Sequence, residues 1–304
     1  MIPLLALMTT YGAHAATWSV GATDGAHLAV ASREPIIRVW GLPPTGPGVD
    51  LSPSGTSRPR VSDLCVRDGQ VAIATDWGAT VEVRGVDGRV GPVLRPAARR
   101  VSAVACLDGG GWAVIGLPAR ADPDPEAAGT GPGVVFVYDR AGAQIDRWEV
   151  PGGAVAIVSG AVGGLAALGA SGQVWEGKVG AGLPQLISGA RELLPGGGGR
   201  ALARSSGGGL VAASAERVCV AGGACFAADG GAGRLAASAG AIAVGGFEAT
   251  VVYGLDGRVL FTLPGRPAML RFDDNGDLAV ITGSALVHVD GRTWRESGRV
   301  MPGG

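Results

Sequence analysis

The chain alternates between short apolar runs and short polar turns, and one apolar run recurs along its length. This run has six residues, is apolar at nearly every position, and carries Ala in the third position of six copies and Val in the other. The seven copies occupy residues 27–32, 70–75, 111–116, 164–169, 209–214, 241–246 and 277–282. Consecutive apolar residues predict a strand that is covered on both faces. A run that returns every 32 to 53 residues predicts a repeat protein.

The same elements flank each copy. A turn such as Arg67-Asp68-Gly69 precedes the copy, and a shorter apolar strand such as residues 61–66 precedes that turn. A strand rich in β-branched and aromatic residues follows, as at 134–138, and a fourth strand often comes after an Asp-Gly-Arg turn, as at 256–258. Four short strands repeated seven times predict an all-β, seven-bladed β-propeller with four antiparallel strands per blade over residues 16–299. No window keeps a period of 3.6 residues, so we expect almost no helix.

Several stretches are similar to known propeller repeats. HLAVASREPIIRVWGL, residues 27–42, resembles the WD40 repeat, in which a strand of small residues is followed by a strand ending in Arg-Val-Trp-Asp. Here Gly41 stands at the Asp position, and the Gly-His dipeptide of that family is absent. Residues 133–142 resemble the FG-GAP repeats of integrin-type propellers, and residues 137–148 are similar to quinoprotein-like repeats. No single motif is complete, and the resemblance implies a WD40-like propeller, a type whose members mostly bind partners and catalyse nothing.

The N-terminus has two interpretations. Residues 2–8 are apolar, and Ala13-His14-Ala15-Ala16 follows as an A-x-A cleavage pattern, so residues 1–15 are predicted to be a signal peptide. The segment carries no Lys or Arg, and the alternative is that residues 3–10 form a strand that closes the ring against the last blade. Residues 300–304 form a C-terminal tail. No run of 18 apolar residues occurs, so the sequence predicts no membrane-spanning helix.

Composition and charge exclude some classes of partner. The hydrophobic fraction of 47% is enough for a folded core despite 55 glycines. The net charge is −1 and the arginines are scattered along the sequence, with Arg99-Arg100 as the densest basic spot. Because no basic stripe is visible, we expect no nucleic-acid partner.

The four cysteines follow the repeat. Cys219 and Cys225 flank a Gly-Gly turn and are expected to face each other across a hairpin. Cys65 and Cys106 each stand five residues before their six-residue strand, which predicts equivalent places on adjacent inner strands. Both pairs are candidate disulfides, the hairpin pair first, and four reduced, buried thiols are the alternative. An even number of cysteines and the cleavage pattern predict a periplasmic or secreted protein, with the cytoplasm as the alternative.

Candidate chemistry is sparse. The only histidines are His14, His27 and His288, and the sequence contains no HExxH, no Cys/His cluster and no G-x-S-x-G. The run Asp273–Asp277 offers oxygen ligands to Ca²⁺, but a turn between two strands explains it at least as well. We therefore predict no catalytic residue, no metal site and no cofactor.

A candidate binding face follows from the longest interval between copies. It marks an acidic insertion, residues 117–133, which joins the second and third strands of its blade. Loops carry function more often than the scaffold does, and the other loops of this kind share its face. The alternative is a solvated loop with aromatic residues packed on neighbouring blades. The candidate binding residues are Arg33, Glu34, Asp76, Trp77, Arg120, Asp122, Asp124, Glu126, Glu216, Arg217, Phe247 and Glu248.

The leading hypothesis is a non-enzymatic, exported module that binds another protein or an extracellular ligand. One alternative is a secreted propeller enzyme of the lyase or lactonase type with its site at the central channel. Such an enzyme needs titratable side chains at the channel, and the inner strands offer only Asp63 and Arg271. Three or more His, Asp or Glu side chains lining one mouth of the channel would contradict the binding-module hypothesis. The other alternative is a cytoplasmic assembly scaffold.

Overall fold

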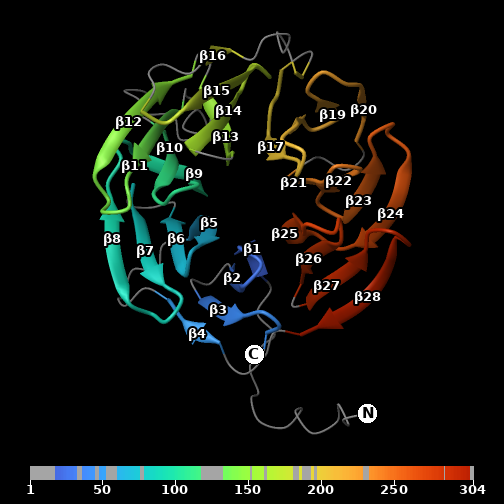
Figure 1. Cartoon of the computed structure of the whole chain (residues 1–304), viewed down its shortest axis with the longest axis horizontal. Coiled ribbons are helices and arrows are strands. Elements are labelled where there is room, and N and C mark those ends of the chain that lie inside the picture. The colour runs from blue at the N-terminus through green and yellow to red at the C-terminus, as the bar shows by residue number, and fades with distance from the viewer. Residues whose placement is uncertain are drawn as a thin grey trace, which may run out of the picture.

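A computed structural model describes most of the chain as seven sheets arranged around a central axis (Figure 1). Each sheet has four antiparallel strands that follow one another in the sequence, which confirms the predicted seven-bladed β-propeller. None of the described residues belongs to an α-helix, and none therefore forms a helix able to cross a membrane. The described residues are 18–32, 36–44, 48–52, 60–75, 79–117, 133–150, 153–160, 163–180, 185–186, 193–194, 197–228, 233–283 and 285–301.

The first strand of each blade lies next to the axis, and the fourth lies at the rim (Figure 1). The inner strands are β1 (Trp18–Thr23), β5 (Val61–Arg67), β9 (Arg100–Cys106), β13 (Ala154–Ser159), β17 (Ala201–Arg204), β21 (Arg234–Ala237) and β25 (Pro267–Phe272). The second strands are β2 (His27–Ser32), β6 (Gln70–Thr75), β10 (Trp112–Leu117), β14 (Gly164–Gly169), β18 (Leu210–Ala213), β22 (Ala241–Gly245) and β26 (Leu278–Thr282). The seven repeated six-residue runs thus coincide with the second strands.

The outer half of each blade is less regular. The third strands are β3 (Ile37–Gly41), β7 (Val81–Gly85), β11 (Val134–Tyr138), β15 (Val174–Lys178), β19 (Arg217–Val220), β23 (Ala249–Gly254) and β27 (Ala285–Asp290). The fourth strands are β4 (Val49–Asp50), β8 (Val90–Leu94), β12 (Gln144–Glu149), β16 (Gln185–Leu186), β20 (Cys225–Ala227), β24 (Val259–Pro264) and β28 (Arg295–Val300). Two of these rim strands, β4 and β16, are only two residues long.

The core consists of seven apolar clusters, one between each pair of neighbouring blades. Successive side chains of a strand point to opposite faces of its sheet. On β6, Ala72 packs in the cluster toward the third blade, whereas Val71 and Ile73 pack toward the first. The second strand of each blade therefore buries both of its faces. This is why the repeated run is apolar at consecutive positions.

The ring closes through the first and last inner strands. β1 packs beside β25, and the Trp18 amide donates a hydrogen bond of 3.1 Å to the Gly283 carbonyl. All four strands of the last blade come from residues 267–300. The predicted leader at residues 1–15 and the alternative closing strand at 3–10 lie outside the described residues.

Both candidate disulfides are formed. Cys219 and Cys225 are directly opposed across the β19–β20 hairpin, with Cα atoms 4.1 Å apart. The bond between Cys65 and Cys106 joins β5 to β9, with Cα atoms 5.7 Å apart. The prediction that these two occupy equivalent places is wrong by one residue. Cys65 lies opposite Ala72, the third residue of its repeated run, whereas Cys106 lies opposite Trp112, the second residue of the next run. The turn between β5 and β6 is shorter than the connection between β9 and β10, and this difference shifts the register.

Candidate functional site

The seven-fold arrangement gives the molecule two faces. We call one the entry face: it holds the connections from fourth to first strands and from second to third strands, where the inner strands begin. We call the other the turn face: it holds the connections from first to second and from third to fourth strands, where the inner strands end. The central channel opens at an entry mouth on one side and at a turn mouth on the other.

The structure places four predicted binding residues on the entry face. Glu216 and Arg217 are exposed at the connection between β18 and β19, and Phe247 and Glu248 are exposed between β22 and β23. Phe247 is 61% exposed, and the Arg266 guanidinium lies 5.2 Å from the centre of its ring. The other predicted residues, which are Arg33, Glu34, Asp76, Trp77, Arg120, Asp122, Asp124 and Glu126, lie outside the described residues. Binding by any of the twelve stays a prediction.

An ion pair crosses the channel just inside the entry mouth. Asp63 of the second blade lies 3.7 Å from Arg234 of the sixth blade, and the Val104 amide donates a 3.0 Å hydrogen bond to its other carboxylate oxygen. Burial raises the pKa of Asp63 above its ordinary value, and the opposing effects of Arg234 and the hydrogen bonds do not cancel this. Sequence analysis identified Asp63 but gave it no partner, because the contact joins strands far apart in the chain.

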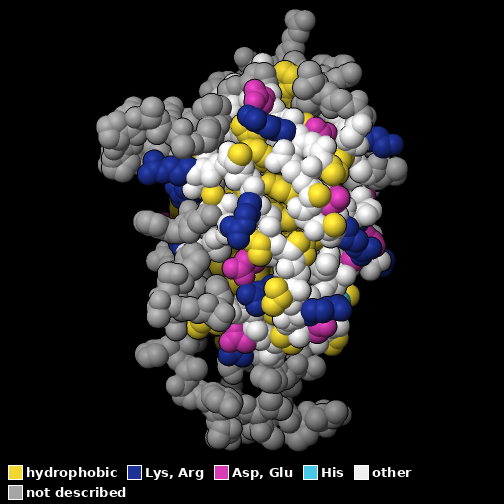
Figure 2. Space-filling view, turned by 90° about the vertical axis from the view of Figure 1, so that its left-hand side faces the viewer, with side chains coloured by type: hydrophobic (Ala, Val, Ile, Leu, Met, Phe, Trp, Pro, Cys, Tyr) yellow, Lys and Arg dark blue, Asp and Glu magenta, His cyan; other side chains and the backbone are white. Residues whose placement is uncertain are grey.

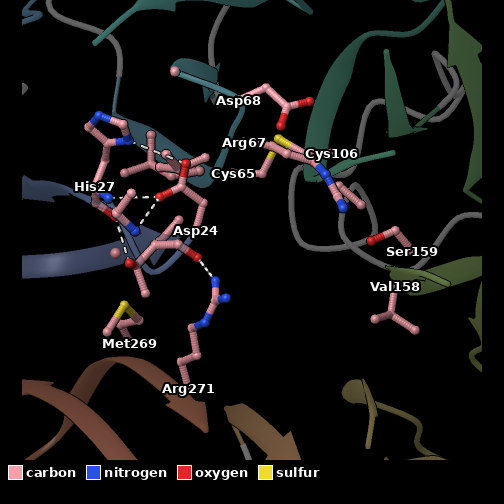
Figure 3. A pocket seen from close by; sticks show the side chains of 18 of the residues that line it. Asp24, His27, Cys65, Arg67, Asp68, Cys106, Val158, Ser159, Met269 and Arg271 are labelled. Atoms are coloured by element: carbon pink, nitrogen blue, oxygen red, sulfur yellow. Dashed lines mark hydrogen bonds and ion pairs between the residues drawn. A yellow bond between two sulfur atoms is a disulfide. The ribbon is translucent and has the colours of Figure 1, made fainter. Parts of the chain in front are cut away.

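Two hollows lie at the opposite end of the channel from the predicted binding face. Two adjoining depressions of about 670 and 710 Å³ open at the turn mouth, a size typical of ligand pockets. Figure 3 shows the first of them. Apolar side chains of the inner strands form their walls, and charged side chains surround the opening. The residues common to both depressions are Arg67, Val158, Ser159, Leu270 and Arg271.

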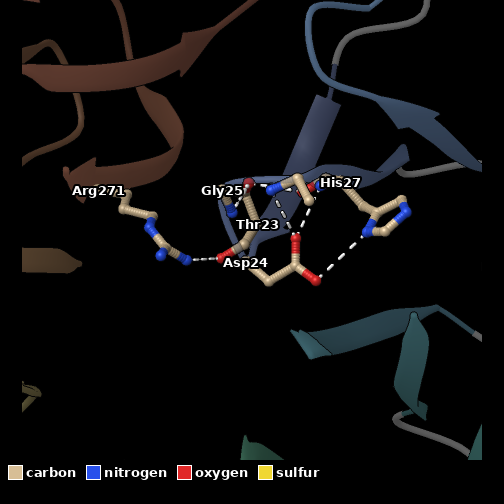
Figure 4. A network of polar contacts seen from close by, with 6 residues as sticks. Thr23, Asp24, Gly25, His27 and Arg271 are labelled. Atoms are coloured by element: carbon tan, nitrogen blue, oxygen red, sulfur yellow. Dashed lines mark hydrogen bonds and ion pairs between the residues drawn. The ribbon is translucent and has the colours of Figure 1, made fainter. Parts of the chain in front are cut away.

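A network around Asp24 forms one side of the turn mouth (Figure 4). One carboxylate oxygen accepts hydrogen bonds from the amides of Ala26, at 2.9 Å, and His27, at 2.7 Å. The other oxygen lies 3.3 Å from Nδ1 of His27. Burial alone would raise the pKa of Asp24, but these hydrogen bonds outweigh it and lower the pKa below its ordinary value. Arg271 reaches from the last blade and donates a hydrogen bond to the Thr23 carbonyl.

Ion pairs join neighbouring blades around the rest of the turn mouth. Arg67, at the end of β5, pairs with Asp108 in the turn after β9. Arg204, at the end of β17, pairs with Glu176 of β15 and donates a 3.1 Å hydrogen bond to the Gly208 carbonyl. The Cys65–Cys106 disulfide also lines the opening (Figure 3). These links fix the charged side chains in position.

This mouth carries more charged side chains than the sequence pattern predicted. Arg67 and Arg204 were missed because each is the last residue of an inner strand, next to a turn. By number, the histidine and carboxylates at this mouth exceed the three that would count against a binding module, and they are Asp24, His27, Asp68, Asp108, Glu176, Asp273 and Asp274. Four of them are engaged in structural contacts: Asp108 and Glu176 are held in ion pairs, and Asp24 and Asp273 accept amide hydrogen bonds within their own turns. The mouth is therefore a second candidate site. Among the described residues, no group of three or more His, Cys, Asp or Glu is arranged to hold a metal ion.

The run Asp273–Asp277 is engaged in turn formation. The Asp273 carboxylate accepts hydrogen bonds from the amides of Asn275, at 2.9 Å, and Asp277, at 2.8 Å. The Asp277 carboxylate accepts one from the Gly291 amide at 2.8 Å. These contacts are those of a turn between two strands and favour that interpretation over a calcium loop.

The comparisons with known proteins support the fold alone. No family model matches the chain, and no curated protein does either. Among solved structures, a computationally designed protein called Ika8 is similar, with a TM-score of 0.62 and 17% sequence identity. The match covers 97% of this chain and 90% of the designed one. A likeness at this identity carries no information about what the chain binds.

Proposed function

We propose that the chain is a non-enzymatic, WD40-like binding module that recognises a protein partner through its entry face. The observation that carries this proposal is the exposed Phe247 with Arg266 against its ring. An aromatic ring and a guanidinium side by side form the kind of contact that is enriched at the centre of protein interfaces. The acidic insertion follows β10 and precedes β11, so it belongs to a connection between second and third strands, as Phe247 does.

The two disulfides support a location outside the cytoplasm. Disulfides persist in the periplasm and in secreted proteins, whereas the cytoplasm keeps thiols reduced. We therefore propose a periplasmic or secreted protein. A cytoplasmic assembly scaffold is the alternative, and it would carry four reduced thiols.

The test compares two exposed apolar residues of the same blade. Phe247→Ser removes the ring on the entry face, and Val259→Ser makes a similar change on rim strand β24, where Val259 is 56% exposed. Each variant and the unchanged chain are used to capture partners from the compartment in which the protein resides, followed by quantitative mass spectrometry. We expect a partner recovered by the unchanged chain and by Val259→Ser to be lost with Phe247→Ser.

Equal recovery by all three proteins would place binding elsewhere. Failure of the unchanged chain to enrich any protein over a matrix control would contradict a protein-interaction role. Circular dichroism of both variants confirms that neither substitution disturbs the blades.

A second candidate function is supported by the turn mouth. His27 has a carboxylate partner in Asp24 and lines a depression large enough for a small ligand, an arrangement that general bases use. This favours a propeller enzyme of the lyase or lactonase type. Turnover of lactones or acidic polysaccharides by the unchanged chain, together with its loss in His27→Gln, would support this candidate. An inactive chain on these substrates would remove it.

A further inference from the structure

The arginines that look scattered in the sequence recur at one place in the blades. In five of the seven blades an arginine immediately precedes the inner strand or begins it. The other two blades have Thr17 and Gly153 before their inner strands, so none of the seven blades has a carboxylate at this position of the repeat. We call this ring at the entry mouth the arginine collar: Arg60, Arg100, Arg200, Arg234 and Arg266.

The collar surrounds the entry mouth of the channel, which is narrow enough for one ion pair to cross it. Arg234 of the sixth blade reaches Asp63 of the second, so one side chain and its partner span the channel at this level. Arg234 is half-buried by this pairing, whereas the other four collar arginines are exposed. Arg266 connects the collar to Phe247. A ligand entering this mouth therefore meets guanidinium groups on several sides and an aromatic ring at one edge.

Among the described residues, neither the turn mouth nor the rim has a comparable ring of arginines. At the turn mouth, three arginines are accompanied by six carboxylates. On the rim, arginines and acidic side chains lie beside each other (Figure 2), and Arg147 pairs with Glu149 at 2.6 Å on β12. Glu216 and Glu248 also lie on the entry face, in the connections between second and third strands. The Glu248 carbonyl accepts a 2.6 Å hydrogen bond from the Gly265 amide, so one carboxylate residue borders the collar next to Arg266.

We propose that the arginine collar binds an acidic, extended segment of the partner protein at the entry mouth. This proposal rests on the entry face being the binding face. Guanidinium groups form paired hydrogen bonds with carboxylates, which gives both charge and geometric recognition. A peptide segment fits a small ring with an aromatic edge, whereas a nucleic acid crossing the face would meet Glu216 and Glu248.

The test uses a dye-labelled decaglutamate peptide and fluorescence anisotropy. One variant carries Arg60→Gln, Arg200→Gln and Arg266→Gln. Its matched control carries Arg89→Gln, Arg258→Gln and Arg292→Gln, which removes the same charge from exposed turns of the opposite face. We expect the collar variant to bind the peptide about tenfold more weakly or worse, and the control to change by less than about twofold. Binding should also weaken as salt is added, because the contacts are ionic.

Three results would overturn the proposal. They are an absence of binding by the unchanged chain, equal weakening by both triple variants, and tighter binding of a labelled ten-residue oligothymidylate that depends on the collar. The last would indicate a nucleic acid instead. The capture experiment separates this proposal from the proposed function. If a partner is lost with Phe247→Ser but decaglutamate does not bind, the collar proposal fails and the binding module stands.

Discussion

The small third residue of the repeated run faces the next blade, whereas the large second residue faces the previous one. Ala72 therefore shares its cluster with Trp112, which is the second residue of the following copy. Small side chains of one blade and large side chains of the next fill a single layer, which is how tightly packed cores are built. The sequence revealed that this position is small, but only the stacking of blades explains why.

A larger side chain at this position should push two blades apart. We expect Ala72→Leu to lower the free energy of unfolding by about 1–3 kcal/mol, because extra methylene groups strain a filled core. The control is Ala97→Leu at an exposed alanine, for which the expected change is within about 0.5 kcal/mol. Urea unfolding followed by tryptophan fluorescence measures both. An unchanged stability for Ala72→Leu would mean that the interface is not closely packed.

The half-buried pair of Asp63 and Arg234 at the entry mouth should make stability depend on pH. The pKa of Asp63 is raised in the folded chain, so the folded state favours the protonated carboxyl. The protonated carboxyl contributes its full stabilisation when the pH is below ~3.9, the pKa of Asp in the unfolded chain. This contribution is lost as the pH rises through the pKa of Asp63 in the folded chain. It amounts to about 1.4 kcal/mol for each pH unit by which the two pKa values differ.

Asp63→Asn should remove this dependence. We expect the variant to become more stable relative to the unchanged chain as the pH is raised from about 3 to about 7. Urea unfolding at the two values measures the difference. A relative loss of stability over the same range would show that Arg234 stabilises the ionised carboxylate enough to lower its pKa.

At the scale of elements, the blade pattern was predictable, while contacts between blades were not. Alternation, turns and repeat spacing predicted the sequence of strands, because these depend on neighbouring residues. The position of Cys106 shows the limit, since the length of the turn after β9 decides which way its side chain points. Cys65 and Cys106 face each other because their positions in the two blades differ by one residue. Two cysteines in equivalent places would have pointed in the same direction around the ring.

The two disulfides should contribute unequally to stability. A cross-link removes conformational freedom from the unfolded chain, and the effect grows with the length of chain enclosed. The Cys65–Cys106 bond spans 41 positions and the Cys219–Cys225 bond spans 6. On this basis we expect Cys65→Ser with Cys106→Ser to cost about 4 kcal/mol, and Cys219→Ser with Cys225→Ser to cost about 2 kcal/mol.

Urea unfolding of the two double variants gives the comparison. Intact-mass spectrometry after alkylation, with and without reductant, first confirms that the native protein carries both bonds. Four alkylated thiols without reductant would contradict the disulfides and support the cytoplasmic alternative.

At the scale of the whole molecule, the ring of blades brings residues that are far apart in the sequence together at the two mouths of the channel. The entry mouth gathers arginines, and the turn mouth gathers both arginines and carboxylates. The sequence predicted the entry face through Phe247 and the acidic insertion. It did not predict the collar or the depressions at the turn mouth, because each collects one or two residues from several blades. Sites of this kind appear only when the blades are placed around the axis. The turn mouth has two depressions of ligand size, and the entry face has the exposed aromatic ring. Either face is therefore a candidate binding face.

Hydrogen–deuterium exchange of the chain, alone and with its captured partner, distinguishes the two faces most directly. We predict slower exchange in the complex at residues 246–248 and 265–266 on the entry face, with no change at residues 24–27 and 107–111 on the turn face. Slower exchange confined to the turn-face segments would contradict the proposed binding face.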